Sequence, residues 1–202
     1  MSTIFDESAA TTRLAARLRA EREARGWTLA DLATRSGVSR AMVSKVERGE
    51  ASPTAALLGR LSAAYGLTLS QLFAQVEGGG RVTRVSEQPV WRDPETGFLR
   101  RSLSPPGGAP MELVWGELPP GAKVAYPAPA YSHIADQQVV VLDGVLVITQ
   151  GNVAHDLASG DCLRFGPPQD TTFHNPGAVP CRYLVAVLRA ADGTDARPTP
   201  VV

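Results

Sequence analysis

Apolar residues keep a helical spacing through about the first third of the chain and lose it afterwards. Leu14 and Leu18 stand four residues apart, and the segment 57–65 carries a second stripe of leucines closed by Tyr65. Such spacing places apolar side chains on one face of a helix, which can pack against a core. Two shorter amphipathic segments lie between these stripes. The pattern predicts one small bundle of five helices, at residues 12–25, 28–36, 39–47, 52–65 and 68–73.

The second and third of these segments carry their own start and stop signals. Thr28 can cap a helix by accepting a hydrogen bond from the amide of Asp31, whose carboxylate can return the bond. Gly37 follows at a point where a chain leaving a helix favours a left-handed residue, and Ser39 is the next cap. The segment 28–49 is thus predicted to form two short helices joined by a tight turn.

The spacing of Ala33, Gly37 and Val43 is that of a helix-turn-helix. A small residue lets the two helices touch, a glycine makes the turn, and a β-branched residue fills the angle between them. Val43 and Val46 point the second helix inward, which leaves its opposite face without a packing role. An ordinary helical corner is the alternative, because any two-helix corner can produce this spacing. The outward face carries Arg40, Ala41, Ser44, Lys45 and Arg48.

Beyond residue 80 the period of the pattern changes. Proline and glycine recur between short runs rich in β-branched residues, and Leu142-Asp143-Gly144 supplies a turn between two of them. Eight or more short strands in about 120 residues predict a closed barrel or jelly roll, because either arrangement hides the edges of its sheets. The predicted strands are 81–85, 98–104, 112–117, 139–142, 145–149, 162–165, 171–174 and 182–188.

The chain is therefore predicted to be a multidomain α + β protein. Gly78-Gly79-Gly80 favours neither helix nor strand and suits a linker between the two parts. The expected units are a flexible N-terminal tail at residues 1–10, a five-helix domain at 11–74, a linker with a first strand at 75–90, and a β-barrel domain at 91–202.

Charge is distributed unevenly between the two parts. Twenty Lys and Arg balance twenty Asp and Glu over the whole chain, but residues 11–76 hold ten basic against five acidic side chains, a difference of +5. Residues 78–202 hold ten against twelve, a difference of −2. A basic helical part suits a polyanion such as nucleic acid, whereas the mildly acidic remainder suits another partner.

No feature of the sequence indicates export or membrane insertion. Residues 1–10 contain Asp6 and Glu7 and no apolar stretch, so they do not resemble a signal peptide. No apolar run reaches the roughly twenty residues that span a bilayer. Cys162 and Cys181 lack CxxC spacing and are expected to be reduced thiols, with a redox pair as the alternative. We expect a cytoplasmic protein with no membrane partner.

The helical part resembles the DNA-binding domain of the lambda-repressor-like (XRE) regulators. The resemblance covers residues 13–73 and rests on Gly26-Trp27-Thr28-Leu29, Ser36-Gly37-Val38-Ser39 and Val46-Glu47-Arg48-Gly49. It implies that the third helix is a recognition helix, which enters the major groove of double-stranded DNA.

The same resemblance assigns roles to individual side chains. The family pairs an arginine with the glutamate that ends its recognition helix, which implies an ion pair between Arg22 and Glu47; two independent solvated charges are the alternative. One unit covers too few bases for specificity, so a homodimer on a palindromic operator is expected. Base edges are assigned to Arg40, Ala41, Ser44 and Lys45, and phosphates to Thr28, Ser39 and Arg48.

Two stretches of the β-rich part resemble the two motifs of the cupins. Residues 121–144, ending in Val139-Val140-Val141-Leu142-Asp143-Gly144, resemble the first motif, and residues 160–177 resemble the second. The resemblance covers residues 118–189 and implies a jelly-roll barrel. A helix-turn-helix followed by a cupin is similar to a family of small bacterial transcriptional regulators that includes the sulfur-utilisation type.

Metal-binding cupins offer three histidines and a glutamate to the interior of the barrel, a set that suits a divalent transition metal. The matching positions of this chain are Tyr131, His133, Gln137 and Thr171. Only His133 keeps the expected ligand type, so we expect no metal, no cofactor and no enzymatic activity. A metal held by His133 with Cys162 or Cys181 is the alternative.

Those four residues suit an organic ligand instead. All four can form hydrogen bonds, and Val139 and Phe173 supply an apolar wall. The sequence thus predicts a transcription regulator whose barrel dimerises, senses a small polar metabolite, or does both. One alternative is a metal-dependent cupin oxygenase or isomerase fused to a DNA-binding domain, which metal analysis of the purified protein would identify. Another, a toxin–antitoxin-like protein-binding module, has no distinctive sequence signal.

Overall fold

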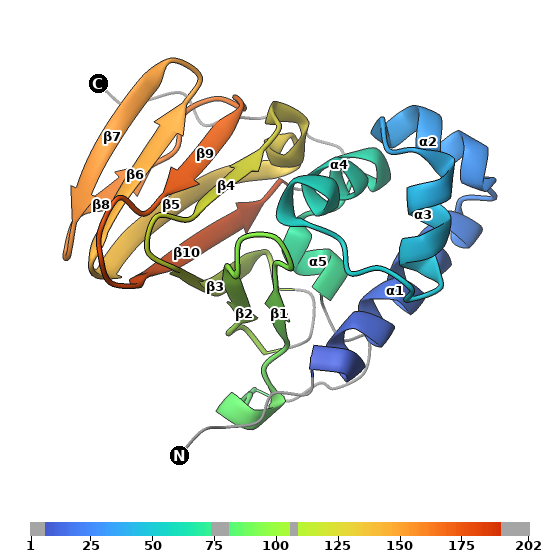
Figure 1. Cartoon of the computed structure of the whole chain (residues 1–202), viewed down its shortest axis with the longest axis horizontal. Coiled ribbons are helices and arrows are strands. Elements are labelled where there is room, and N and C mark those ends of the chain that lie inside the picture. Colours follow the sequence, from blue (N-terminus) through green and yellow to red (C-terminus); the bar gives the residue numbers. More distant parts are fainter. Residues whose placement is uncertain (1–6, 74–80, 106–108, 191–202) are drawn as a thin grey trace.

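The computed structural model describes residues 7–73, 81–105 and 109–190, which form a helical part followed by a β-rich part. Figure 1 shows the helices at one end of the molecule and the strands at the other. The helices are α1 (Glu7–Ala24), α2 (Leu29–Ser36), α3 (Arg40–Glu47), α4 (Ala55–Tyr65) and α5 (Leu69–Phe73).

These bounds confirm the five predicted helices and change two of their starts. α4 begins at Ala55, three residues later than predicted, because Thr54 is its N-cap. α1 begins at Glu7 rather than at Thr12, so residues 7–10, which were expected in a flexible tail, are helical. An acidic first residue and the two alanines that follow it favour a helix here, through the helix dipole and intrinsic propensity. The rest of the predicted tail and the predicted glycine linker at 78–80 lie outside the described residues.

The strands form two antiparallel sheets, as expected of a jelly roll. In the larger sheet the order is β1-β2-β3-β10-β5-β8, and in the smaller one it is β4-β9-β6-β7. The first sheet contains β1 (Val90–Arg92), β2 (Leu99–Ser102), β3 (Met111–Leu118), β5 (Ile134–Asp143), β8 (Cys162–Arg164) and β10 (Cys181–Arg189). The second contains β4 (Lys123–Tyr126), β6 (Val145–Gln150), β7 (Val153–Ala158) and β9 (Thr171–His174).

One predicted strand does not form, and three strands, β1, β4 and β7, were not predicted. β1 was missed because it is only three residues long. No strand forms at 81–85, where Val82 and Val85 are 62% and 58% exposed and have no core to pack against; a short 3-10 helix η1 (Val85–Glu87) follows instead. β4 was missed because it buries only Val124. β7 was missed because none of its six residues is fully buried. Both of these strands are set by pairing with their neighbours rather than by an apolar pattern of their own.

The core of the β-rich part lies between the two sheets. Val139 and Val141 of β5 face Leu146 and Ile148 of β6 in one buried cluster. Their alternation along each strand directs every second side chain inward. The predicted turn at Leu142–Gly144 is confirmed between these strands, and Gly144 adopts a φ of 86° there. Of the described helices, none is long and apolar enough to cross a membrane.

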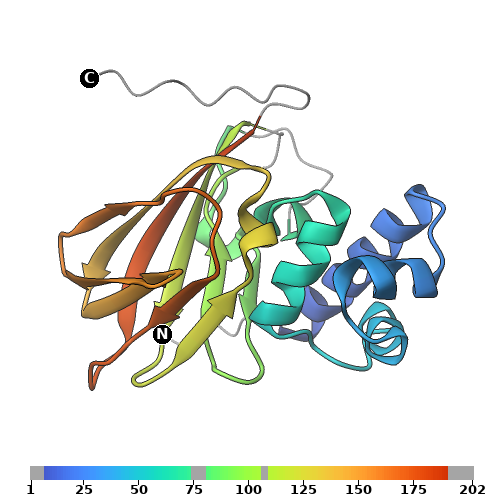
Figure 2. The same ribbon diagram turned by 90° about the horizontal axis from the view of Figure 1, so that it is seen from above.

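The helical part packs against one end of the barrel through α4 and α5. Figures 1 and 2 show α4 beside β4 and the 3-10 helix η2 (Ala128–Tyr131). Gly59 permits this approach, because a β-carbon there would lie 3.2 Å from atoms of Tyr126 and Pro127. The carboxylate of Asp93, in the loop between β1 and β2, accepts a hydrogen bond from the amide of Ala55 at 2.7 Å. A β-loop thus caps the first turn of α4 and joins the two parts.

Candidate functional site

The turn between α2 and α3 has the caps that the sequence predicts. Thr28 accepts a hydrogen bond from the amide of Asp31 at 3.1 Å, and the Asp31 carboxylate accepts one from the amide of Thr28 at 2.8 Å. Gly37 ends α2 with a φ of 66°, and Ser39 caps α3 by accepting from the amide of Met42. These bonds satisfy free amides of both helix starts and fix the angle at which α3 leaves the turn.

α3 divides into a buried face and an exposed face. Val43 and Val46 are each 1% exposed and pack into the helical core. The residues assigned to DNA from the sequence all lie outside that core: Thr28, Ser39, Arg40, Ala41, Lys45 and Arg48 are exposed, and Ser44 is partly exposed. Met42, also 38% exposed, is an apolar addition to this face that the sequence analysis did not single out. The face is open to a partner along its length.

The cations on this face differ in how they are held. Arg48 donates to the Glu50 carboxylate at 2.6 and 2.8 Å and also contacts the hydroxyl of Ser44. Arg40 and Lys45 form no ion pair with any residue that the structure describes. Two cations on α3 are therefore available to an outside partner, whereas Arg48 is already engaged.

The predicted ion pair between Arg22 and Glu47 is confirmed. Arg22 Nε and Nη2 both donate to the Glu47 carboxylate, at 2.8 Å each, and the two side chains are 13% and 6% exposed. The hydrogen bond to Glu47 raises the pKa of Arg22. Arg22 Nη1 also donates to the carbonyl of Trp27 at 2.9 Å. One guanidinium thereby fastens α1 to the end of α3 and to the start of the turn.

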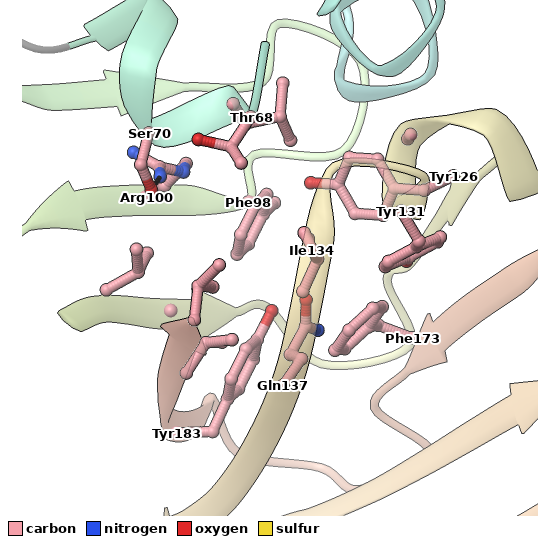
Figure 3. A pocket seen from close by; sticks show the side chains of 16 residues that line it. Thr68, Ser70, Phe98, Arg100, Tyr126, Tyr131, Ile134, Gln137, Phe173 and Tyr183 are labelled. Carbon is pink, nitrogen blue, oxygen red and sulfur yellow. Dashed lines mark hydrogen bonds between the residues drawn. The ribbon is translucent and has the colours of Figure 1, made fainter. Parts of the chain in front are cut away.

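A cavity lies at the junction of the barrel and the helical part. Its volume is about 80 Å³, and it opens to solvent at its mouth. Thr68, Leu69 and Ser70 line it from the helical part. Figure 3 shows how the barrel surrounds the rest with aromatic rings. The labelled lining residues of the barrel are Phe98, Arg100, Tyr126, Tyr131, Ile134, Gln137, Phe173 and Tyr183.

The four residues predicted to bind a ligand are not brought together as one set. Tyr131 and Gln137 line the cavity. Thr171 is buried beside them and donates to the carbonyl of Gln169 at 3.0 Å. His133 was wrongly placed: its side chain is exposed, and its imidazole ring faces Gly66 at the end of α4. His133 follows η2 and precedes β5, so strand alternation does not direct it into the barrel.

This arrangement does not fit the metal site of a metal-binding cupin. In the part of the chain that the structure describes, no three His, Cys, Asp or Glu side chains are grouped as metal ligands. At the matching positions, Tyr131 and Thr171 are buried hydroxyls, Gln137 is a neutral amide, and His133 points outside the cavity. Cys162 is exposed on β8 and Cys181 is buried, and both thiols are free.

The sequence analysis missed the cation of this cavity, Arg100. Arg100 lies on β2, is 6% exposed, and donates to Ser70 of α5 at 2.5 Å and to Ser102 at 2.9 Å. Its guanidinium carbon is 4.9 Å from the centre of the Phe73 ring. Burial lowers the pKa of Arg100 to about 10, which leaves the group charged at neutral pH. The alternation of Phe98, Arg100 and Ser102 along one strand face was the available signal.

Four of the uncharged polar side chains that line the cavity lack a hydrogen-bond partner among the described residues. Tyr131 has a buried hydroxyl without a hydrogen bond among the described residues. The same holds for the hydroxyls of Tyr126 and Tyr183 and for the side-chain amide of Gln137. Burial raises the pKa of all three tyrosines, so they remain protonated donors at neutral pH. The cavity thus offers several unused hydrogen-bonding groups on an apolar wall.

Comparisons with known proteins agree with both parts of this structure. The helix-turn-helix family HTH_3 matches residues 18–72, and the cupin domain family Cupin_2 matches residues 114–187. The HTH-type transcriptional regulator SutR of Escherichia coli (strain K12) is 25% identical over 171 residues, which are 81% of this chain and 88% of SutR.

One solved structure has the same fold. A crystal structure of an HTH_3 family transcriptional regulator from Vibrio cholerae covers 92% of this chain and 99% of its own, with a TM-score of 0.72 and 21% identity. A looser match, hydroxypropylphosphonic acid epoxidase from S. wedmorenis, covers 90% and 99% with a TM-score of 0.44 and 18% identity. The chain therefore combines a helix-turn-helix domain that matches HTH_3 with a C-terminal domain that matches Cupin_2, and over most of its length it is similar to the transcriptional regulator SutR.

Proposed function

We propose that the protein is a regulator that reads a specific double-stranded DNA operator through α3 and senses a small metabolite in the cavity of its cupin domain. The exposed face of α3 is the observation that carries the DNA-binding half. Its inner valines are fully buried, while Arg40 and Lys45 project outward without an ion-pair partner among the described residues. If α2 and α3 only formed a helical corner in the fold, two cations without ion-pair partners on the outer face of α3 would serve no structural purpose.

In this proposal the bases are read by the N-terminal and outer residues of α3. Arg40 and Lys45 can donate to O6 and N7 of guanine in the major groove, and the methyl group of Ala41 can contact a thymine methyl. Ser44 is assigned to the same edge, but its hydroxyl is in contact with Arg48 and must be released or shared. Thr28, Ser39 and Arg48 are assigned to phosphates, which fix the register of the helix.

Specificity requires two copies. A single α3 covers only a few base pairs, so we propose a homodimer on a palindrome with half-sites about one turn apart. The proposed units are the helix-turn-helix domain at 11–74, the connecting segment at 75–90 and the cupin domain at 91–202, which supplies the dimer contact. Such a protein works in the cytoplasm, where bacterial DNA is found.

The sensing half rests on the cavity at the domain junction. Tyr131 and Gln137 line it with polar side chains, and the hydroxyl of Thr171 acts on that of Tyr131. Because Ser70 and Thr68 of the helical part share this wall, a bound molecule contacts both domains at once. To regulate, that molecule must bind two arrangements of the DNA-binding domains with different affinity.

Two arginine substitutions test the DNA-binding half. We expect Arg40→Ala to lose about 1–3 kcal/mol of affinity for the selected operator and to relax its sequence preference. Arg48→Ala should weaken binding to operator and random DNA alike and reduce the salt dependence by about one ion. Arg60, exposed on α4, is the matched control, since Arg60→Ala removes the same charge away from α3. The measurement is fluorescence anisotropy with fragments selected from a random DNA library.

Two results would contradict the assignment of Arg40 to bases and of Arg48 to phosphates. Equal losses on operator and random DNA for both Arg40→Ala and Arg48→Ala would show that neither residue reads bases. A loss for Arg60→Ala as large as that for Arg40→Ala would show that only net charge matters.

A further inference from the structure

Arg100 is a buried cation without a carboxylate partner in the described part of the chain. It lies at the end of the cavity that α5 closes, as Figure 3 shows beside Ser70. A guanidinium has five N–H donors, and two of these donate to Ser70 and Ser102, which leaves three unused. A buried charge is costly unless an opposite charge or a full set of hydrogen bonds compensates it. The site is therefore electrostatically incomplete.

The carboxylate that acts on Arg100 does not neutralise it. Glu112 of β3 is the carboxylate whose charge acts most on Arg100, yet it forms no ion pair with it. Glu112 instead lies 3.5 Å from Arg189, and these two side chains are only 15% and 20% exposed. Glu112 thus pairs with Arg189, and the positive charge of Arg100 at the cavity is not neutralised by an ion pair.

The walls around Arg100 are apolar and aromatic. Phe98, Phe173 and Tyr183 line the cavity, with Phe98 stacked on Tyr183 at 6.3 Å between ring centres. Gly116 makes room for this ring, because a β-carbon there would lie within van der Waals overlap of Tyr183. An inorganic anion would leave these walls without a contact. A molecule that satisfies the whole cavity has one anionic end and an apolar body.

We propose that the cavity binds a small organic monocarboxylate with an apolar body, whose carboxylate accepts hydrogen bonds from Arg100 and from the hydroxyl of Ser70. The apolar body lies against the aromatic wall, and Gln137 and Tyr131 supply polar contacts at the far end. This inference names the class of molecule for the proposed sensing function and rests on it. Since Ser70 belongs to α5 and Arg100 to β2, the carboxylate bridges the DNA-binding domain and the cupin domain.

The test uses two probe pairs of matched shape on the full-length protein without DNA. 3-Phenylpropanoate and octanoate are compared with 3-phenylpropanamide and octanamide by calorimetric titration and by intrinsic tryptophan fluorescence. Trp91 contributes to that signal near the cavity, with its ring centre 5.8 Å from that of Phe73. We expect each acid to bind at least about tenfold more tightly than its amide, the worth of charge-assisted hydrogen bonds to a guanidinium. Arg100→Gln should remove that preference, and Arg100→Lys should keep part of it.

Arg164→Gln is the matched control. Arg164 lines a neighbouring, larger hollow that shares Tyr131 and Gln137 with the cavity, but it already pairs with Asp136 at 3.0 Å. The preference for acid over amide should survive this substitution. Loss of the preference in Arg164→Gln but not in Arg100→Gln would overturn the proposal by moving the carboxylate to the other hollow. Ser70→Ala should weaken the acids and leave the amides unchanged, which keeps the test decisive if Arg100→Gln does not fold.

The carboxylate proposal and the proposed sensing function fail in different ways in this experiment. Equal binding of acid and amide to the wild-type protein would refute the anion while leaving a sensing cavity in place. Absence of binding by all four probes would remove the sensing function and the anion together. As a second measurement, a saturating acid should change operator affinity at least about fivefold in the wild-type protein and not in Arg100→Gln.

Discussion

Two arginines, Arg22 in the helical domain and Arg100 at the junction with the cupin domain, have opposite kinds of partner. Arg22, inside the helical domain, donates hydrogen bonds from two of its nitrogens to the carboxylate of Glu47 and from the third to the carbonyl of Trp27. Arg100, at the junction with the cupin domain, meets two serine hydroxyls and an aromatic ring, and no carboxylate among the described residues. Both are guanidinium cations, and each is largely shielded from solvent, Arg22 partly and Arg100 almost fully.

Arg22 is a structural charge, and Arg100 is a charge that can bind an outside anion. A charge whose partner is supplied by the chain adds rigidity, because removing either side leaves the other buried and unpaired. A buried charge without a counter-ion has an uncompensated desolvation cost, which an anionic ligand can offset. The helical domain thus has a closed network that keeps α3 fixed, whereas the junction has an open one that can respond to a molecule.

The largest expected effect comes from removing each arginine in turn. Arg22→Met should cost about 3–5 kcal/mol of unfolding free energy, because it leaves the Glu47 carboxylate buried without a partner. Arg100→Met should cost less than about 1 kcal/mol, because only two serine hydroxyls lose a donor while an apolar side chain fills the space. Urea unfolding followed by circular dichroism measures both. Equal costs would contradict the contrast, and Arg19→Met, in the exposed pair with Glu23, should leave stability unchanged.

An intermediate effect is expected at the bond that joins the domains. Asp93 is 2% exposed and accepts from the amide of Ala55 with one oxygen and from the amides of Glu95 and Thr96 with the other. Asp93→Ala should cost about 2 kcal/mol and split the calorimetric unfolding into two transitions. Asp93→Asn keeps an acceptor and should cost less than half as much. A single unchanged transition in Asp93→Ala would show that this cap does not couple the domains.

The smallest effect is expected for Arg48, an exposed arginine at the end of α3 that already has a carboxylate partner. Arg48 lowers the pKa of Glu50 through their hydrogen bond, so Glu50 is ionised at neutral pH and competes with phosphate for Arg48. Glu50→Gln should raise affinity for operator and random DNA alike by about two- to threefold, an advantage that shrinks as salt rises. Anisotropy titrations at two salt concentrations measure it. A gain confined to the operator would contradict the assignment of Arg48 to phosphate.

The helical domain could be predicted closely because its signals are local. The caps at Thr28 and Ser39 and the left-handed turn at Gly37 depend on neighbours within a few residues. The ion pair of Arg22 and Glu47 spans 25 residues and came from resemblance rather than from spacing. The edge strand at 153–158, in contrast, has no pattern of its own and forms because a neighbour offers it hydrogen bonds.

The cavity residues were predicted only in part, because their roles depend on contacts between distant segments. Tyr131 and Gln137 were identified from their motif positions and do line the cavity. His133 occupies a motif position as well, but the short helix before it turns its ring toward Gly66. Arg100 belongs to no motif, and its importance depends on Ser70, thirty residues earlier in the chain.

The sequence by itself determined the two domains, the corner that presents α3 and the exposed basic face of that helix, because helix caps, glycine turns and apolar periodicity act over a few residues. Only the tertiary structure decided which cation is neutralised and which is left open, since ion pairing depends on where distant carboxylates come to lie. It also decided that α5 closes the cupin cavity. That contact places a serine of the DNA-binding domain against an unpaired guanidinium of the barrel.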